Sequence, residues 1–221
     1  MLKRKGNEHG LAWLFLGVFV ILALLVKIDA SSIQSIDDQG FQLLANLNGA
    51  VATTLFTGIA TLASPVMTVL VMVVFSTVLY LKHYRLLGLF ALATFIGGDA
   101  IALGMKYLVA RLRPSNQLVA DTGYSFPSGH VLGTVLLVTI LLAIGLQFIS
   151  SQPLRVGLVV AGILWVILVM VSRVYLRDHY TSDVLGSCLL AEGCWYQAKA
   201  WFCRWESQLL ARLNQRQRAN R

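Results

Sequence analysis

The chain has 221 residues, of which 57% are apolar and only 13% charged, with a formal net charge of +8 at pH 7. This composition lies far from that of soluble globular domains, and it also excludes disordered, collagen-like and disulfide-stapled secreted proteins. The sequence therefore predicts an integral membrane protein with a single domain, residues 1–221, that has room for about six membrane-spanning helices.

Six apolar runs are long enough to cross a bilayer. In chain order they cover residues 11–28, 62–81, 86–108, 131–149, 154–171 and 184–203. The first run follows three basic residues, as in a secretory signal, but no small-residue cleavage pattern comes after it, so we expect it to be retained. The expected fold class is all-α: a polytopic bundle of six transmembrane helices.

The segment between the first two runs has a helical pattern of its own. Apolar residues recur there at spacings close to three and four from Ile33 to Leu55, with polar residues between them. This pattern predicts an amphipathic helix that lies in the extracytoplasmic interface of the membrane. An extension of the second span that packs on the bundle accounts for the same periodicity equally well.

The basic residues of the short loops indicate how the helices cross the membrane. Alternation of the spans puts most of them, with both termini, on the cytoplasmic side: Lys3, Arg4, Lys5, Lys82, Arg85, Arg155 and the arginines from Arg204 onward. Because they serve as topology signals, the net positive charge does not imply a nucleic-acid partner. Further basic residues break the bias on the other side and need another explanation: Lys106, Arg111, Arg113, Arg173 and Arg177.

Two of these cations lie at the extracytoplasmic end of the third span. Lys106 and Arg113 are seven residues apart, about two helical turns, so both side chains can point to one side of a helix that Pro114 closes. A single basic residue at a span end would be interpreted as reaching for the interface. Two cations that converge indicate a site for an anion.

A second cluster, Pro127, Ser128, Gly129 and His130, leads into the fourth span. Ser128 can cap the helix, Gly129 lets the backbone approach an anion closely, and the free N–H groups of a helix N-terminus bind phosphate. The same tetrapeptide is also an ordinary helix entry, so alone it does not decide between the two interpretations.

The third cluster lies between the fifth and sixth spans. His179 and Asp183 are four residues apart, which on one helical face lets the carboxylate accept from Nδ1–H and leaves Nε2 free as a nucleophile. Arg173 adds a third positive charge suited to phosphate oxygens. The three clusters together predict a site that binds a phosphate and stabilises charge on it during transfer.

No metal or other cofactor is expected at this site. The nearby carboxylates are Asp121, Asp178 and Asp183, and because Asp183 is committed to His179, too few ligands remain for magnesium. Two histidines without a nearby cysteine do not complete a closed zinc site. Two further acids, Asp99 and Glu192, lie inside predicted spans, and we expect buried polar packing or a protonated state for them in preference to a functional role.

The three clusters read K-x6-R-P, P-S-G-H and S-R-x5-H-x3-D, and in this order the chain resembles the type-2 phosphatidic acid phosphatase family. The resemblance implies that His179 attacks phosphorus, that Asp183 orients it, and that His130 protonates the leaving oxygen and then activates water. It further implies a set of phosphate-binding residues: Lys106, Arg113, Ser128, Gly129 and Arg173. The soluble vanadium-dependent haloperoxidases share these motifs, but six spans favour a lipid substrate.

The resulting hypothesis is a plasma-membrane phosphatase that acts on a lipid phosphate or diphosphate at the extracytoplasmic face. Bacterial phosphatases of undecaprenyl diphosphate or phosphatidylglycerol phosphate are the family members most similar in size. A lipid phosphotransferase would use the same phosphohistidine, and a non-enzymatic protein would bind or transport the anion or lipid without turnover. The motifs do not select a headgroup, a tail length or an oligomeric state.

Overall fold

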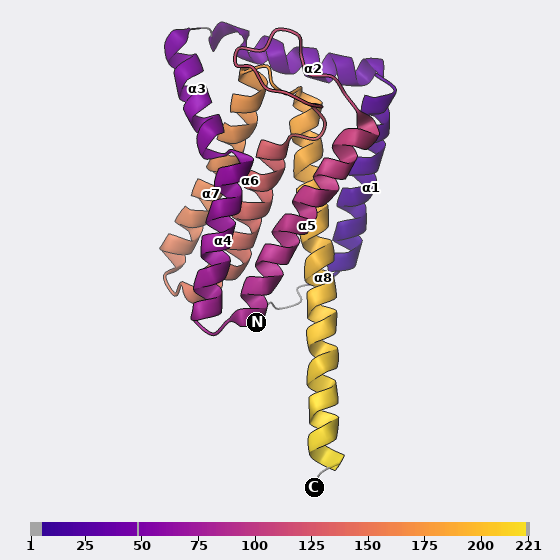
Figure 1. Cartoon of the computed structure of the whole chain (residues 1–221), viewed down its shortest axis with the longest axis vertical. Helices are drawn as coiled ribbons and strands as arrows, with labels where there is room; N and C mark the ends of the chain where they lie inside the picture. Colours follow the sequence, from indigo (N-terminus) through magenta and orange to yellow (C-terminus); the bar gives the residue numbers. More distant parts are fainter. Residues whose placement is uncertain (1–5, 48, 220–221) are drawn as a thin grey trace.

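The structure is a computed structural model that describes residues 6–47 and 49–219, with side chains described as far as Glu206. Within these residues the secondary structure is helical and has no strand, which confirms the all-α part of the predicted fold class; the six spans and the interfacial helix stay predictions. The helices are α1 Glu8–Lys27, α2 Ser31–Leu44, α3 Ala50–Leu62, α4 Pro65–Leu81, α5 Arg85–Val109, α6 Gly129–Ile140, α7 Gln152–Tyr175 and α8 Thr181–Ala219 (Figure 1). A π-helical turn, Leu141–Gly145, and a 3-10 turn, Leu146–Phe148, extend α6.

Short polar side chains set several helix starts, as the sequence predicts for caps. Asn7 accepts from the N–H of Gly10 at the start of α1. Ser64 caps α4, and Pro65 occupies its first turn, where no backbone N–H donor is needed. The predicted second span therefore starts three residues too early, because Leu62 still belongs to α3 and Ser64 begins a new helix.

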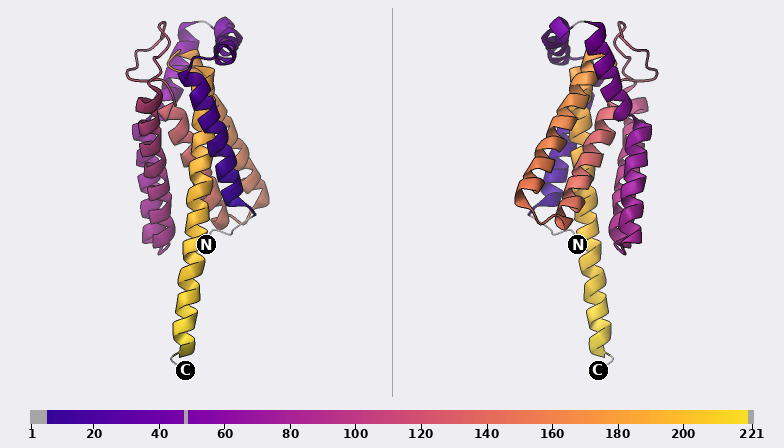
Figure 2. Two further views of the ribbon diagram at one scale, coloured as in Figure 1. Left: turned by 90° about the vertical axis from the view of Figure 1, so that its right-hand side faces the viewer. Right: turned by 90° about the vertical axis from the view of Figure 1, so that its left-hand side faces the viewer.

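The long helices stand side by side, and α8 lies among them, packed mainly against α1 and α6 (Figures 1 and 2). Their shared core is built from large apolar side chains that are fully buried, among them Phe95, Leu132 and Leu136. The outward faces are also apolar: Ile21 on α1 and Leu164 on α7 are each 60% exposed. An apolar exterior of this extent fits a lipid solvent.

Among the residues that the structure describes, four helices are long and apolar enough to cross a membrane: α1, α5, α6 with its extension to Phe148, and α7. The pair α3 and α4, bent by 41° at its junction, makes a fifth candidate if it forms one broken span. The same criteria do not select α8, although it runs through the bundle. The sixth span therefore stays a prediction.

The amphipathic segment between the first two predicted spans is divided between two helices. One part, α2, lies across the ends of the other helices (Figure 1), and the other part, α3, turns toward α4. Ile33 on α2 is buried, whereas Val51 and Leu55 on α3 are exposed. The segment thus contains two separate helices, and both interpretations of its periodicity, including the membrane position of α2, stay predictions.

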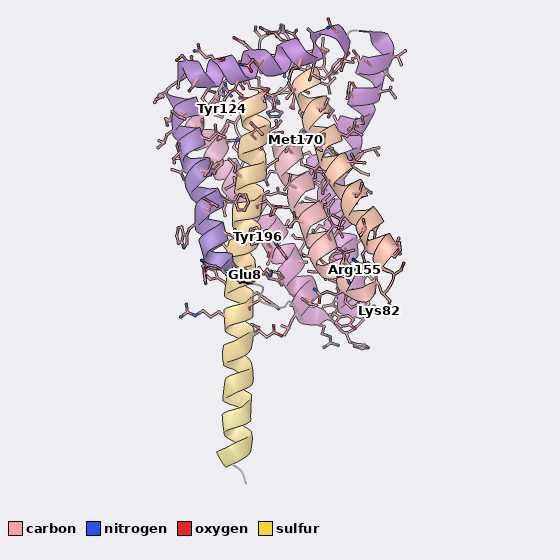
Figure 3. The ribbon with its side chains drawn as sticks, turned by 180° about the vertical axis from the view of Figure 1, so that it is seen from behind. Glu8, Lys82, Tyr124, Arg155, Met170 and Tyr196 are labelled. Carbon is pink, nitrogen blue, oxygen red and sulfur yellow. The ribbon has the colours of Figure 1, made fainter. Side chains whose placement is uncertain are left out.

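The two ends of the bundle differ in character. Lys82, Arg155 and Glu8 lie at the end away from α2, where the described chain also begins, whereas Tyr124 lies beside α2 (Figure 3). The loop that carries Tyr124 and the turn that joins α7 to α8 are both at the α2 end (Figure 1). All three motif clusters therefore meet at this end.

Candidate active site

Alternating helix directions bring the predicted site residues together beneath α2. Lys106 lies in the last turn of α5 and Arg173 in that of α7, while Gly129 and His130 begin α6. Arg113 lies in the loop after α5, His179 in the turn between α7 and α8, and Asp183 in the first turn of α8. The contacts described below connect Arg113, Arg173, His179 and Asp183.

His179 and Asp183 face each other in the interior of the protein. Nδ1 of His179 lies 3.5 Å from Oδ2 of Asp183, and the two side chains are 1% and 0% exposed. The distance exceeds that of an ordinary hydrogen bond, and Nδ1 has no closer partner among the described residues. The carboxylate therefore faces the ring at a distance slightly longer than that of a hydrogen bond.

The sequence prediction placed this pair on one helix, and that detail is wrong. His179 precedes α8, which begins at Thr181. Oδ2 of Asp183 accepts from the backbone N–H of Tyr180 at 2.9 Å, so the carboxylate caps the helix start. One side chain therefore both starts α8 and faces the imidazole.

The other edge of the His179 ring faces a cation. Nη1 of Arg113 lies 3.4 Å from Nε2 and donates to the carbonyl of Asp178 at 2.9 Å. Burial lowers the pKa of His179 to about 4, although the neighbouring Asp183 acts in the opposite direction. The ring is therefore neutral at pH 7, and a proton on Nδ1 toward Asp183 leaves the Nε2 lone pair facing the cations.

Two guanidinium groups meet at a single carboxylate oxygen. Oδ2 of Asp121 lies 2.9 Å from Nη1 of Arg113 and 2.8 Å from Nη2 of Arg173. Burial by itself would raise the pKa of Asp121, but the two arginines and the N–H of Thr122 hold it below its ordinary value. A negatively charged oxygen thus occupies a position beside His179 that suits an oxygen of a phosphate.

Arg173 also has an N–H donor that none of the described residues uses. Its Nη1 pairs with Oδ2 of Asp178 at 3.1 Å, and its side chain is only 4% exposed. Its Nε is buried and has no hydrogen-bond partner among the residues that the structure describes. An unmatched buried donor is costly, and an anion bound here would satisfy it.

The remaining predicted residues lie on neighbouring elements at the same end of the bundle. Nζ of Lys106 donates to the carbonyl of Tyr124 at 2.7 Å, which ties the α5 end to the following loop. Ser128 is buried and caps α6 through a long contact of 3.5 Å from its Oγ to the N–H of Val131. His130 is half-buried and lies where the charges of Arg173, His179 and Arg113 act on it.

The predicted helical alignment of Lys106 and Arg113 is not observed. Helix α5 ends at Val109, since Ala110 adopts a left-handed conformation with a φ of 54°. Arg113 instead reaches the site from the loop, where its Nε donates to the carbonyl of Gly123 at 3.1 Å. Loop hydrogen bonds, and not helix periodicity, bring it next to His179.

Three residues that the motifs do not contain complete the surroundings of Asp183. Nη1 of Arg111 donates to Oδ1 of Asp183 and to Oγ of Ser182, both at 2.8 Å. Nη2 of Arg111 donates to Asp37 on α2 at 2.6 Å. The sequence held a signal for each charge: Arg111 breaks the positive-inside bias, and Asp37 lies four residues after Ile33, on the apolar face of its helix.

Other acidic side chains of the predicted spans lie apart from these contacts. Oε1 of Glu192 accepts from the hydroxyl of Thr139 at 2.7 Å, a polar contact between α8 and α6, and Asp99 and Glu192 are both half-buried, so their role stays a prediction. In the part of the chain that the structure describes, no three histidine, cysteine, aspartate or glutamate side chains are grouped as metal ligands. Independence from a metal stays a prediction.

Comparison with known proteins connects this site to a family. The model of the PAP2 superfamily matches residues 85–206, which contain all three motif clusters. Phosphatidylglycerophosphatase B of Haemophilus influenzae is 43% identical over 74 residues, which cover 32% of this chain and 30% of that protein.

Two relatives match over most of their length. Phosphatidylglycerophosphatase B of Bacillus subtilis is 29% identical over 76% of this chain and 83% of its own. An undecaprenyl-diphosphatase of Sulfolobus acidocaldarius is 28% identical over 83% of this chain and 86% of its own.

The fold also matches a solved structure. The crystal structure of a transmembrane PAP2 type phosphatidylglycerolphosphate phosphatase from Bacillus subtilis superposes with a TM-score of 0.74, at 24% identity over 86% of this chain and 94% of that one. The predicted family resemblance is confirmed by the superfamily match, and the expected helical membrane fold by this superposition.

Proposed function

Because this chain belongs to the PAP2 superfamily and is a phosphatase, we propose that it hydrolyses a lipid phosphate or diphosphate through a phosphohistidine on His179. The names of its relatives favour two substrates, undecaprenyl diphosphate and phosphatidylglycerol phosphate. In this proposal the protein lies in the plasma membrane, and its active site opens on the extracytoplasmic face.

One observation carries the proposal. Arg113 and Arg173 converge on a single anionic oxygen at 2.9 and 2.8 Å, and Arg113 also lies 3.4 Å from Nε2 of His179. A phosphate whose oxygens bind these guanidinium groups would thus lie beside the nucleophilic nitrogen. Fixed cations around a transferring phosphoryl group stabilise the charge that it carries in the transition state.

In the first step the lone pair of Nε2 attacks phosphorus, the N–P bond forms, and the bond from phosphorus to the leaving oxygen breaks. His130 gives its proton to that oxygen, and Asp183 stabilises the positive charge that develops on the His179 ring. In the second step His130 takes a proton from water, the water oxygen attacks phosphorus, and the N–P bond breaks. Lys106, Ser128 and the N–H of Gly129 assist the two arginines in holding the phosphate oxygens.

The charge distribution supports an extracytoplasmic site. Lys82 and Arg155 lie at the end of the bundle opposite to the site (Figure 3), and basic loop residues favour the cytoplasmic side. The exposed apolar faces of α1 and α7 belong in the bilayer, where a lipid substrate can enter the protein laterally. Both termini are then cytoplasmic.

Phosphate release from purified protein tests the substrate class. The panel contains undecaprenyl diphosphate, phosphatidylglycerol phosphate, phosphatidic acid and a soluble diphosphate, and we expect the lipids to be preferred. Transfer to an added acceptor alcohol in place of release would instead identify a phosphotransferase, and binding without turnover an anion or lipid carrier.

Two histidine variants test the chemistry. His179→Ala should be inactive on every substrate and should form no labelled phosphoenzyme. His130→Ala should lose about a hundredfold or more on a lipid, whose alkoxide is a poor leaving group. With p-nitrophenyl phosphate it should still give a burst, because that leaving group needs no proton. A burst from His179→Ala and none from His130→Ala would exchange the two roles.

A further inference from the structure

We propose that Asp37 and Arg111 form a positioning pair that holds the Asp183 carboxylate in its orientation toward His179, so that α2 becomes part of the active site. This inference rests on the proposed role of His179 as the nucleophile. Asp37 lies outside residues 85–206, the region that the superfamily model matches.

Asp37 connects α2 to the first turn of α8. Its side chain is 3% exposed, although its helix lies across the end of the bundle (Figure 1). Oδ1 accepts from the backbone N–H of Ser182 at 2.8 Å, and Oδ2 accepts from the Ser182 hydroxyl at 3.0 Å. A carboxylate at a helix N-terminus receives free N–H donors, so these bonds fix the start of α8 beside Asp183.

Arg111 lies between two carboxylates and donates to both. Its Nη2 bonds Asp37 at 2.6 Å and its Nη1 bonds Oδ1 of Asp183 at 2.8 Å, while its guanidinium carbon lies 3.8 Å from the centre of the Tyr180 ring. The planar fork of an arginine suits this bridging geometry, which a lysine cannot reproduce with one nitrogen. Stacking on Tyr180 fixes the plane of the fork.

These contacts leave Asp183 a single orientation. Oδ1 is occupied by Arg111, and Oδ2 accepts from the N–H of Tyr180 while it faces Nδ1 of His179. Rotation of the carboxylate would break the hydrogen bonds from Arg111 and from the N–H of Tyr180 in a fully buried position, where no water can replace them. The pair thus keeps one oxygen directed at the imidazole before substrate arrives.

Removing the charge of Arg111 and removing that of Asp37 should shift the pKa of His179 in opposite directions. Without the positive charge of Arg111, both carboxylates act unopposed on His179 and raise its pKa. Without the negative charge of Asp37, Arg111 acts on Asp183 alone, and the pKa of His179 falls. A purely structural defect would have no reason to move the two variants in opposite directions.

Other charged or titratable groups face this pair or His179 and stay constant across the variants. They are Lys106 at the end of α5, Arg113 and Asp121 from the loop, Arg173 at the end of α7, Asp178 and Tyr180 in the turn before α8, His130 on α6, and Lys27 and Asp29 around the cavity beside Arg111, at whose edge Asp38 lies exposed as the control position. Because these groups and the substrate are unchanged, differences between variants report the Asp37 and Arg111 charges.

The experiment measures kcat and kcat/KM for phosphate release from about pH 2.5 to about pH 8 in purified full-length protein. The acidic limb of the profile, where kcat/KM falls as the pH decreases, reports the protonation of His179. Arg111→Gln should move this limb to higher pH by about half a unit to one unit, and Asp37→Asn should move it to lower pH by a similar amount. Arg111→Lys keeps the charge, so its limb should stay near the wild type while kcat falls about ten- to hundredfold through lost alignment.

Asp38→Asn is the matched control, since it removes the same charge from the exposed neighbour of Asp37 on α2. It should leave both the limb and kcat unchanged. The positioning role would be overturned if Arg111→Gln and Asp37→Asn shifted the limb in the same direction, or if the limb and kcat of both variants equalled those of the wild type. If Asp37→Asn fails to fold, an unchanged kcat in Arg111→Lys overturns it. An active His179→Ala would instead overturn the proposed function.

Discussion

Asp121→Asn should tighten the binding of phosphate-like anions. In the substrate-free protein the Asp121 carboxylate neutralises Arg113 and Arg173, the same two guanidinium groups that we assign to the substrate phosphate. A phosphate can bind both only after Asp121 has left. An asparagine keeps the bond that Oδ1 accepts from the N–H of Thr122 at 2.8 Å, but it removes the competing charge.

The size of the effect follows from the contacts that are lost. Hydrogen bonds to charged groups contribute about 1.5 to 3 kcal/mol each when they are shielded from water. The Asp121 side chain is 32% exposed and regains hydration when it leaves, so a net cost of about 1 to 2 kcal/mol for its displacement is reasonable. At about 1.4 kcal/mol per factor of ten, the variant should bind the anion about five- to thirtyfold more tightly.

The inhibition constant of orthovanadate measures this directly, because vanadate adopts the five-coordinate geometry of a transferring phosphoryl group. Asp38→Asn serves as the control for general attraction of anions to this end of the protein, and it should leave the constant unchanged. Weaker vanadate inhibition in Asp121→Asn would refute the reasoning, since it would mean that the carboxylate arranges the arginines for substrate and does not compete with it.

Three further outcomes test the site and its surroundings. Cysteine at the exposed position Asn116, in a variant without Cys188, Cys194 and Cys203, should react with an impermeant thiol reagent in intact cells, whereas labelling only after permeabilisation would reverse the topology. A chelator should leave activity intact, and loss of activity that magnesium restores would contradict the metal-free mechanism. Burial holds the pKa of His179 near 4, so the neutral ring persists as the pH falls. The phosphoenzyme burst with p-nitrophenyl phosphate should therefore disappear only near pH 4. Loss of the burst near 6.5, the ordinary pKa of a histidine, would contradict this.

Sequence patterns predict those parts of the fold that depend on local periodicity and on composition. The boundaries of α1, α5 and α7 lie within a few residues of the predicted spans, because long apolar runs end at loops with polar or helix-breaking residues. The predicted fourth span reaches Ile149, whereas regular helix ends at Ile140 and continues as a π-helical and a 3-10 turn. Such a change of hydrogen-bond register leaves no trace in hydropathy.

The site was predictable to the extent that its residues lie in short motifs. Contacts between distant segments were not: Asp37 and Ser182 are separated by 145 residues, and Asp121 and Arg173 by 52. Asp121 entered the prediction only as a candidate metal ligand and Asp37 did not enter it, since a single sequence gives the charge of a side chain but not its partner. Only the packing of α2 on the bundle joins Asp37 to the first turn of α8.

The alternation of helix direction has an electrostatic consequence for the site. Two helix N-termini, those of α6 and α8, point their partial positive charge at it, and two C-termini, those of α5 and α7, point a partial negative charge at it. Lys106 and Arg173 are the basic residues in the last turns of α5 and α7, so each offsets the dipole of its own helix. Replacing either one would thus remove a proposed ligand of the anion and also expose a negative helix end to it, so the loss in anion affinity should exceed that of a single hydrogen bond.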